Sequence, residues 1–495
     1  MISVLKNKEA TLKYAIAGFL LLFVVLVGYA FFNGKYFVAE EDETIYYNCA
    51  RLFSETGSVR ATECNTENVA KVWQCNWYGP MYYLFYGGIA KIAGIHNYNF
   101  LLTNIACLVL ILLLILKADF STEIKLLIIC SFLTLYSMIG YVFTFYPETL
   151  EILFAVILTL KLKKIAIDTG STRKIALYIL LVMFFALFRV STVFWVFGLL
   201  AFSQSRKDFF KKLGLSLACF LLIYLYLSYF NAPVFTGGLA HIMNDKPGLA
   251  VLVYLVRKIA WNAFVFFSRN PFYDLLQIPV ILVAVYSWFI SKNRFMLAAC
   301  IISIIYYIVL LTLYVPYSFF LNKQSACLYP LLLVAFFYTD TSKLKYLTLG
   351  LLLIFSPISY LKAAGLIRAK KQAAIENEKA APLISQIDQI RSKIEGGKPR
   401  TILTLYREFE NDLPYSVLSC NLPASTTDKQ PILYTYNFPI DRQEGSVFKN
   451  ELNFQTHGKL YVDYILSKHA LSIDSTTMVY SCNLFYLYKN NKRTK

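Results

Sequence analysis

Long apolar runs separated by short lysine-rich loops constrain the fold of this chain more than any other feature. The chain has 495 residues, of which 57% are hydrophobic and only 16% are charged. This composition is too apolar for an ordinary soluble protein and is typical of a chain that crosses a membrane many times. The first run, residues 14–32, follows three lysines and precedes no small-residue cleavage site. It therefore predicts an uncleaved signal anchor with a cytoplasmic N-terminus.

The apolar runs predict a polytopic, mainly α-helical bundle of about eleven spans, although several runs are short for a bilayer. The expected spans are residues 14–32, 100–116, 126–142, 149–162, 175–188, 190–202, 213–230, 275–290, 296–314, 326–338 and 347–361. With this count every short lysine-rich loop lies on one side, as the cytoplasmic face requires. The first loop and the C-terminal segment are then expected outside the cytoplasm.

The net charge of +18 comes largely from lysines in the short loops between apolar runs. Lysines in such loops set membrane topology, and no basic stripe with interleaved aromatics occurs on a soluble module. We therefore expect membrane lipids, and no nucleic acid, among the partners.

The composition changes near Arg368, which predicts two domains at residues 1–365 and 366–495. The second is expected to be a small α/β domain. Its expected helix is 370–393 and its expected strands are 401–406, 432–436, 459–465 and 478–488. In the first domain, the short aromatic run 82–92 is expected to lie in the membrane interface, and the long loop 231–270 contains an amphipathic stretch at 254–267.

The cysteines divide into two groups. Five lie in apolar runs and are expected to be packing residues. The other five lie in segments expected outside the cytoplasm, where disulfides can form, and Cys64–Cys75 and Cys420–Cys482 are the natural pairs. No Cys/His spacing indicates a metal site, and the four histidines of the chain argue against a histidine-centred one.

No dinucleotide, P-loop, zinc-protease or serine-hydrolase motif occurs, so chemistry must come from carboxylates and basic residues near the outer membrane boundary. The sharpest signal is Asp42 and Glu43, directly after the first span. These acids could simply start a helix. Their order with Tyr46, the Glu55-Thr56-Gly57 turn and Tyr78-Gly79-Pro80-Met81-Tyr82-Tyr83 favours a functional site.

This arrangement resembles the first external loop of GT-C integral-membrane glycosyltransferases. It is most similar to the group of aminoarabinose (lipid A) transferases and protein O-mannosyltransferases. Those enzymes show Asp-Glu-x-x-Tyr followed by a Pro-Pro-Leu-Tyr-Tyr type stretch, where this chain has Gly79-Pro80-Met81. The resemblance implies a sugar donor linked to a polyprenyl phosphate. It also implies that Asp42 is the general base for the acceptor hydroxyl and that Glu43 orients it or contacts the acceptor.

Further candidates lie near the same expected face. Glu148 matches the second acid that GT-C enzymes often carry, although an acid after Pro147 is also good helix-start chemistry. Glu151 follows on the same helical face, and an ionisable residue in apolar sequence is a functional candidate. Arg189 and Lys323 could bind the donor phosphate or merely reach lipid headgroups. The weaker candidates are Arg257 and Lys258, and Tyr46, Tyr82 and Tyr83 could line the acceptor path or belong to an aromatic belt.

Together these features predict a glycosyltransferase of a bacterial inner membrane, with its C-terminal domain in the periplasm. It would move a sugar from a polyprenyl-phosphate donor to a lipid, glycan or protein acceptor outside the cytoplasm. A flippase or transporter of lipid-linked sugars, and an O-antigen ligase or polymerase, are the alternatives. The sequence requires no cofactor. The cluster of acids directly after the first span could hold a divalent cation, although no ligand spacing indicates one.

Overall fold

The computed structural model describes residues 2–60, 62–64, 75, 79–168, 171–230, 249–269, 293–313, 326–339, 344–404, 409, 414–436, 462–471, 476–482 and 485–491. The chain forms two compact units. The first unit is Met1–Phe32, Leu101–Tyr226 and Thr236–Ile367, and the second unit is Asn33–Phe100, Leu227–Phe235 and Arg368–Lys495. The second unit therefore combines the first loop with the C-terminal segment, which the sequence places in separate domains.

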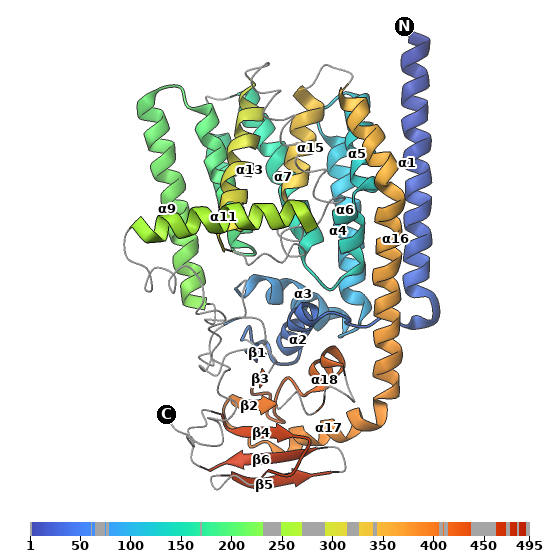
Figure 1. The fold of residues 1–495 in the computed structure, drawn as a ribbon, viewed down its shortest axis with the longest axis vertical. Helices are drawn as coiled ribbons and strands as arrows, with labels where there is room; N and C mark the ends of the chain where they lie inside the picture. Colours follow the sequence, from blue (N-terminus) through green and yellow to red (C-terminus); the bar gives the residue numbers. More distant parts are fainter. Residues whose placement is uncertain are drawn as a thin grey trace. The chain divides into compact units, whose positions relative to one another are not determined.

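The first unit is helical throughout its described residues (Figure 1). Its elements are α1 (Ile2–Phe31), α4 (Tyr98–Lys117), α5 (Thr122–Thr134), α6 (Tyr136–Ile139), the 3₁₀ helix η2 (Gly140–Phe143), α7 (Glu148–Ile167), α8 (Thr172–Ala186), the 3₁₀ helix η3 (Val190–Phe202), α9 (Arg206–Phe230), α11 (Leu249–Arg269), α13 (Arg294–Leu313), α15 (Leu328–Thr339) and α16 (Leu344–Lys379). Helices α4, α9 and α16 each have one end in the second unit.

Several helices are long and apolar enough to cross a membrane. Among the described residues, Glu9–Gly34, Tyr98–Lys117 and Arg206–Phe230 meet both criteria. Two bent helix pairs raise the number of candidate spans from 3 to 5 if each pair counts as one. The chain is thus a mainly helical membrane protein, and the expected eleven spans remain a prediction. The expected span 275–290 lies outside the described residues.

The expected span 126–142 is not one straight helix. The helix breaks at Leu135, which has an extended backbone, and the two halves are bent by 78°. Beyond the break, Asn104 of α4 donates its side-chain amide to the carbonyl oxygens of Tyr141 and Thr144, at 3.3 and 3.0 Å. These bonds hold the end of η2 and the turn after it. At the break itself, the Tyr360 hydroxyl of α16 donates to the carbonyl of Leu133 at 3.0 Å, so polar side chains of other helices support the bend.

The amphipathic run predicted around 254–267 forms α11, which runs crosswise to α13 in Figure 1. Its exposed large side chains include Val256, Trp261 and Phe264. The amphipathic stretch of the sequence is therefore a helix whose exposed side chains include large apolar and aromatic ones.

The second unit contains the short helices of the first loop and an α/β sheet. Its elements are the 3₁₀ turn η1 (Phe32–Gly34, of which Asn33 and Gly34 belong here), α2 (Glu41–Thr56), β1 (Glu63–Cys64), α3 (Met81–Ala93), α17 (Ala381–Lys393), β2 (Arg400–Thr404), α18 (Tyr415–Asn421), β3 (Ile432–Tyr436), β4 (Tyr464–Ser467), β5 (Thr476–Ser481) and β6 (Tyr486–Asn490). In the described part the strand order is β1-β3-β2-β4-β6-β5 (Figure 1).

The sheet joins segments far apart in the sequence. Strands β1, β3, β2 and β4 are parallel, whereas β6 and β5 are antiparallel additions at the other edge. The edge strand β1 comes from the first loop, and Tyr434 donates its backbone N–H to the carbonyl of Thr62 at 2.9 Å. The sheet core is buried and apolar: Ile402, Ile432, Tyr464 and Leu487 are each at most 1% exposed. The first loop is therefore part of this fold and not a separate linker.

The structure corrects several strand predictions. The expected strand 478–488 is two antiparallel strands, β5 and β6, because the chain reverses between Ser481 and Tyr486. Strand β4 begins at Tyr464, later than expected, and β1 was missed because two residues carry no alternating pattern. The strand 432–436 and the helical run 370–393 are confirmed as β3 and as the end of α16 with α17.

The expected disulfides are not formed. Cys482 has a free thiol, which excludes the Cys420–Cys482 bond in this structure. Cys75 is also a free, buried thiol, and burial raises its pKa to about 12. The side chain of Cys64 lies outside the described residues.

Candidate carboxylate sites

The N-terminus of α2 holds the two acids singled out by the sequence. Helix α2 begins at Glu41, and the Glu43 side chain reaches back to accept the backbone N–H groups of Glu40 and Ala39, at 3.3 and 3.2 Å. This is the reciprocal half of a capping box, and the helix dipole favours negative charge at the same place. Asp42 is half-buried, whereas Glu43 is fully buried. The two neighbouring acids therefore have different surroundings.

Glu43 is paired with Lys370 of α16. The Lys370 ammonium donates to Glu43 Oε2, and both side chains are 0% exposed. Burial, followed by the negative charge of Glu43, raises the pKa of Tyr36 well above its ordinary value. The Tyr36 ring stacks on Tyr98 with 5.4 Å between centroids. Sequence reasoning did not single out Lys370, because it is one of several basic residues, Lys362 and Arg368 among them, that follow the apolar run 347–361.

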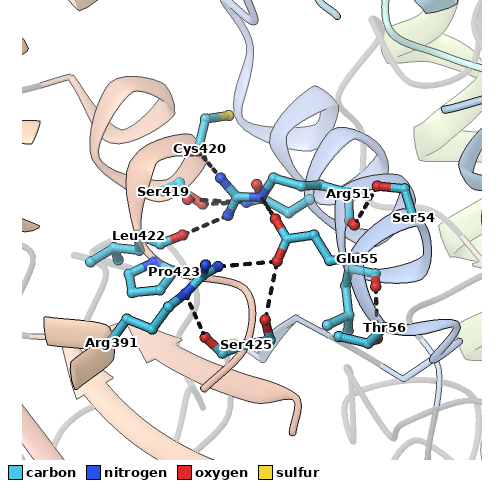
Figure 2. Close-up of polar contacts among 12 residues, drawn as sticks. Arg51, Ser54, Glu55, Thr56, Arg391, Ser419, Cys420, Leu422, Pro423 and Ser425 are labelled. Atoms are coloured by element: carbon cyan, nitrogen blue, oxygen red, sulfur yellow. Dashed lines mark hydrogen bonds and ion pairs between the residues drawn. The ribbon is translucent and has the colours of Figure 1, made fainter. Parts of the chain in front are cut away.

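The opposite end of α2 is bonded to the C-terminal segment (Figure 2). Arg51 donates to the carbonyl oxygens of Cys420 and Leu422, and the Leu422 bond is 2.5 Å long. Glu55 accepts from Arg391 and from the Ser425 hydroxyl, each at 3.1 Å. One turn before Arg51, the Asn48 side chain donates to the Ser419 hydroxyl at 2.9 Å. Polar side chains at i, i+3 and i+7 thus hold one face of α2 against α18 and its neighbours.

The tyrosines proposed for the acceptor path are buried in the packing of α2 and α3. Tyr46, Tyr82 and Tyr83 are 5%, 1% and 1% exposed, and the rings of Tyr46 and Tyr82 meet edge to face at 6.0 Å. Gly87 of α3 approaches α2 so closely that a Cβ there would lie 2.8 Å from the Phe53 side chain. These contacts fix α3 on α2, and a role for the tyrosines in the acceptor path remains a prediction.

A second carboxylate group lies within the first unit. Arg189 occupies the break between α8 and η3, and its guanidinium bonds to both carboxylate oxygens of Glu151. The same guanidinium nitrogen lies 3.5 Å from Glu148 Oε1. The side chains of these three residues are at most 4% exposed. The sequence placed Glu148 and Glu151 on one face of a helix, and the structure adds that both converge on Arg189.

Polar groups of other helices lie around this region of the first unit. The Tyr306 hydroxyl of α13 donates to the Ser191 hydroxyl at 2.9 Å, two residues after Arg189. The Cys327 thiol donates to the same Tyr306 hydroxyl at 3.3 Å. Helices α7 and α13 thus pack against η3, and α15 packs against both of these helices. Lys323, the other proposed phosphate ligand, lies outside the described residues, and Arg257 is an exposed residue of α11.

The metal-ligating side chains in the described part of the chain do not form a metal site. No group of three His, Cys, Asp or Glu side chains gathers there in a way that could hold an ion. At α2, the Glu43 carboxylate is already bonded to Lys370 and two backbone N–H groups. A divalent cation at the acidic residues around the start of α2 remains a prediction.

Comparison with known proteins gives matches among solved structures only. No protein-family model matches the chain, and no curated protein matches it. ArnT from Cupriavidus metallidurans in the apo state has a TM-score of 0.49 at 11% identity, covering 96% of this chain and 98% of that chain. ArnT from the same organism bound to undecaprenyl phosphate has a TM-score of 0.51 at 10% identity, covering 95% and 98%.

A third match is the Archaeoglobus fulgidus oligosaccharyltransferase in complex with Zn and sulfate. Its TM-score is 0.47 at 12% identity, covering 91% of this chain and 67% of that chain. The comparison with the lipid-phosphate-bound ArnT shows that the two chains share a fold over nearly their whole lengths. The resemblance to the aminoarabinose transferase group of GT-C glycosyltransferases is therefore confirmed at the level of the fold.

Proposed function

We propose that this protein is a membrane glycosyltransferase that transfers a sugar from a polyprenyl-phosphate donor to an acceptor outside the cytoplasm. The observation that carries the proposal is the fold shared with ArnT bound to undecaprenyl phosphate, at a TM-score of 0.51 over 95% of this chain. A lipid phosphate of the same class is the donor that this fold suits. The acceptor class, whether lipid, glycan or protein, is left open.

Asp42 is the proposed general base. It lies half-buried at the N-terminus of α2, where a substrate hydroxyl can approach from the unburied side. As the acceptor oxygen bonds to the anomeric carbon, the bond from that carbon to the phosphate oxygen breaks. The acceptor proton passes to the Asp42 carboxylate, and the lipid phosphate leaves with the electron pair. A carboxylate within hydrogen-bond reach of the incoming oxygen can supply this step.

The departing phosphate needs a cation, and Arg189 and Lys323 are the proposed ligands. In this structure the Arg189 guanidinium contacts Glu148 and Glu151. A donor phosphate would therefore have to share Arg189 with these carboxylates, or displace them. Glu148, at 3.5 Å from the guanidinium, is held less closely and stays a proposed catalytic acid.

The proposed location is a bacterial inner membrane with the second unit on the periplasmic side. The apolar helices support a membrane location, and the charge distribution of the loops supports the orientation. A reporter enzyme that works only outside the cytoplasm, fused after Lys495, tests the orientation. Activity of the fusion is expected, and a silent, well-expressed fusion would contradict it.

The function is tested with the purified protein in nanodiscs, a radiolabelled polyprenyl-phosphate sugar and extracted envelope acceptors. The parent protein should transfer label, and Asp42→Asn should lower the rate by about two to four orders of magnitude while donor affinity changes little. The matched control is Asp168→Asn, because Asp168 is an exposed aspartate paired with Lys174. It should behave as the parent.

Two outcomes would contradict the proposal in different ways. Near-parent turnover of Asp42→Asn would remove this residue as the base and move the role to Glu148. Movement of the labelled lipid across sealed vesicles without transfer would instead identify a transporter. The bent helix pairs give that outcome a structural basis, because broken helices are common in transporters.

A further inference from the structure

The Glu43–Lys370 pair joins residues 327 positions apart in the chain, in a place where water has no access. Both side chains are 0% exposed, and a single charge in such a place is costly unless it has a partner. Each of the two charges therefore compensates the other, and removal of either residue would leave one buried charge. A substrate hydroxyl also has no open route to a carboxylate with this burial.

Glu43 and Lys370 together hold the whole turn that leads into α2. Glu43 Oε2 accepts from the N–H groups of Ala39 and Glu40 as well as from Lys370. The main chain of Lys370 adds a further bond, because its carbonyl accepts the N–H of Phe37 at 3.2 Å. Residues 37–43 are thus fixed to α16 through one lysine, by its side chain and its backbone.

A neighbouring ion pair offers an internal reference. Lys35 donates to Glu378 at 2.7 Å, two turns further along α16, and their side chains are 34% and 58% exposed. Both pairs link the segment before α2 to the same helix. They differ in exposure, so only the Glu43–Lys370 pair is expected to impose a fixed position on its neighbours.

We propose that Lys370 is a positioning residue for sugar transfer: it neutralises Glu43 and locks the first turn of α2, and so sets the carboxylate of Asp42. Glu43 is on this view an internal anion of the fold and does not contact the acceptor. The inference rests on the proposed function, since it assumes that Asp42 takes the acceptor proton. Of the two roles considered for Glu43, orienting Asp42 or contacting the acceptor, the proposal keeps only the first.

The test is a double-mutant cycle with Lys370→Met, Glu43→Gln and the two combined, assayed for kcat, KM and donor affinity in one detergent. Rates are taken per folded protein after size-exclusion chromatography. Each single variant should lose about ten- to a hundredfold in kcat. A displaced turn would move the Asp42 carboxylate away from its best hydrogen-bonding position toward the acceptor oxygen. Donor affinity should stay at the parent value. Lys35→Met, the matched control at the exposed pair, should leave kcat unchanged.

The combined variant decides the matter, because it has no stranded charge. Its kcat should return to within about threefold of the parent, because a glutamine at position 43 can still accept the N–H groups of Ala39 and Glu40 and no unpaired charge displaces the turn. A Glu43 that touches the acceptor could not allow this recovery. A combined variant that folds but stays as slow as Glu43→Gln would overturn the proposal, as would a Lys370→Met with parent kcat. If Lys370→Met fails to fold, the combined variant alone gives the answer. Failure of the proposed function shows separately, as absence of sugar transfer by the parent protein, and failure of the base assignment shows as normal turnover in Asp42→Asn.

Discussion

The Glu43–Lys370 pair of the second unit and the Glu148–Glu151–Arg189 group of the first unit are both buried, but their charges balance differently. In the pair, one carboxylate meets one ammonium and two backbone N–H groups. In the group, two carboxylates converge on one guanidinium. The described residues thus give a neutral pair in one unit and a group with one excess negative charge in the other.

The difference separates a structural anion from a reactive one. Glu43 bonds to an ammonium and to two backbone N–H groups, whereas Glu148 lies 3.5 Å from a guanidinium that also bonds to both oxygens of Glu151. On this comparison Glu148 suits chemistry better than Glu43, although the sequence gives the sharper signal at Glu43.

The largest expected effect is that of Arg189→Met. The variant leaves two carboxylates buried near each other, and breaking a buried ion pair from one side costs about 3–5 kcal/mol. The free energy of unfolding, measured in one detergent, should therefore fall at least as far as in Lys370→Met, which strands only one carboxylate. A smaller loss for Arg189→Met than for Lys370→Met would break the comparison.

The next effect separates the two acids beside Arg189. Glu151→Gln removes the closer charge-assisted bonds and should cost about 1.5–3 kcal/mol of unfolding free energy. Glu148→Gln removes the carboxylate that lies farther from Arg189 and should cost less unfolding free energy than Glu151→Gln, while transfer falls roughly a hundredfold or more. Unfolding and transfer are measured on both variants. Equal stability losses would show that the two carboxylates share Arg189 evenly.

The smallest expected effects concern Arg51 and Arg391, which both form ion pairs with the partly exposed Glu55 (Figure 2). Arg51→Met removes two bonds from a side chain that is 13% exposed and should cost about 1.5–3 kcal/mol. Arg391 is 42% exposed, so Arg391→Met should cost less than about 1 kcal/mol. Thermal unfolding of both variants gives the order. Equal losses of unfolding free energy would mean that burial does not determine how much these two arginines contribute to stability.

The spacing of apolar residues and the local composition predicted many of the helices and strands, because neighbouring residues largely determine which of the two a segment forms. The helix 370–393 and the strand 432–436 follow from periodicity and composition alone. The bend at Leu135 could not be predicted, because side chains of other helices take the carbonyls of the bent segment: Tyr360 bonds to Leu133, and Asn104 bonds to Tyr141 and Thr144. A side chain 37 residues away leaves no trace in the pattern of the broken segment itself.

The candidate sites show the same limit. The spacing of Glu148 and Glu151 was enough to place them on one helical face, yet nothing local says that Arg189 bonds to both. The acids Asp42 and Glu43 look alike in sequence, and only the position of Lys370 makes them different. Lys370 itself reads as one more lysine after an apolar span. Sequence therefore found the carboxylates, and the pairing that assigns their roles came from tertiary structure.

The distance of 327 residues between Glu43 and Lys370 also has a consequence for synthesis in the cell. At about 5–20 residues per second, Glu43 emerges from the ribosome roughly 15 to 65 seconds before its partner. Strand β1 likewise waits for β3, which lies at the far end of the chain. During that interval the first loop has neither its ion pair nor its sheet. A newborn chain thus carries this loop unfinished while nearly all its helices are made, and a factor that shields nascent loops would act on it first.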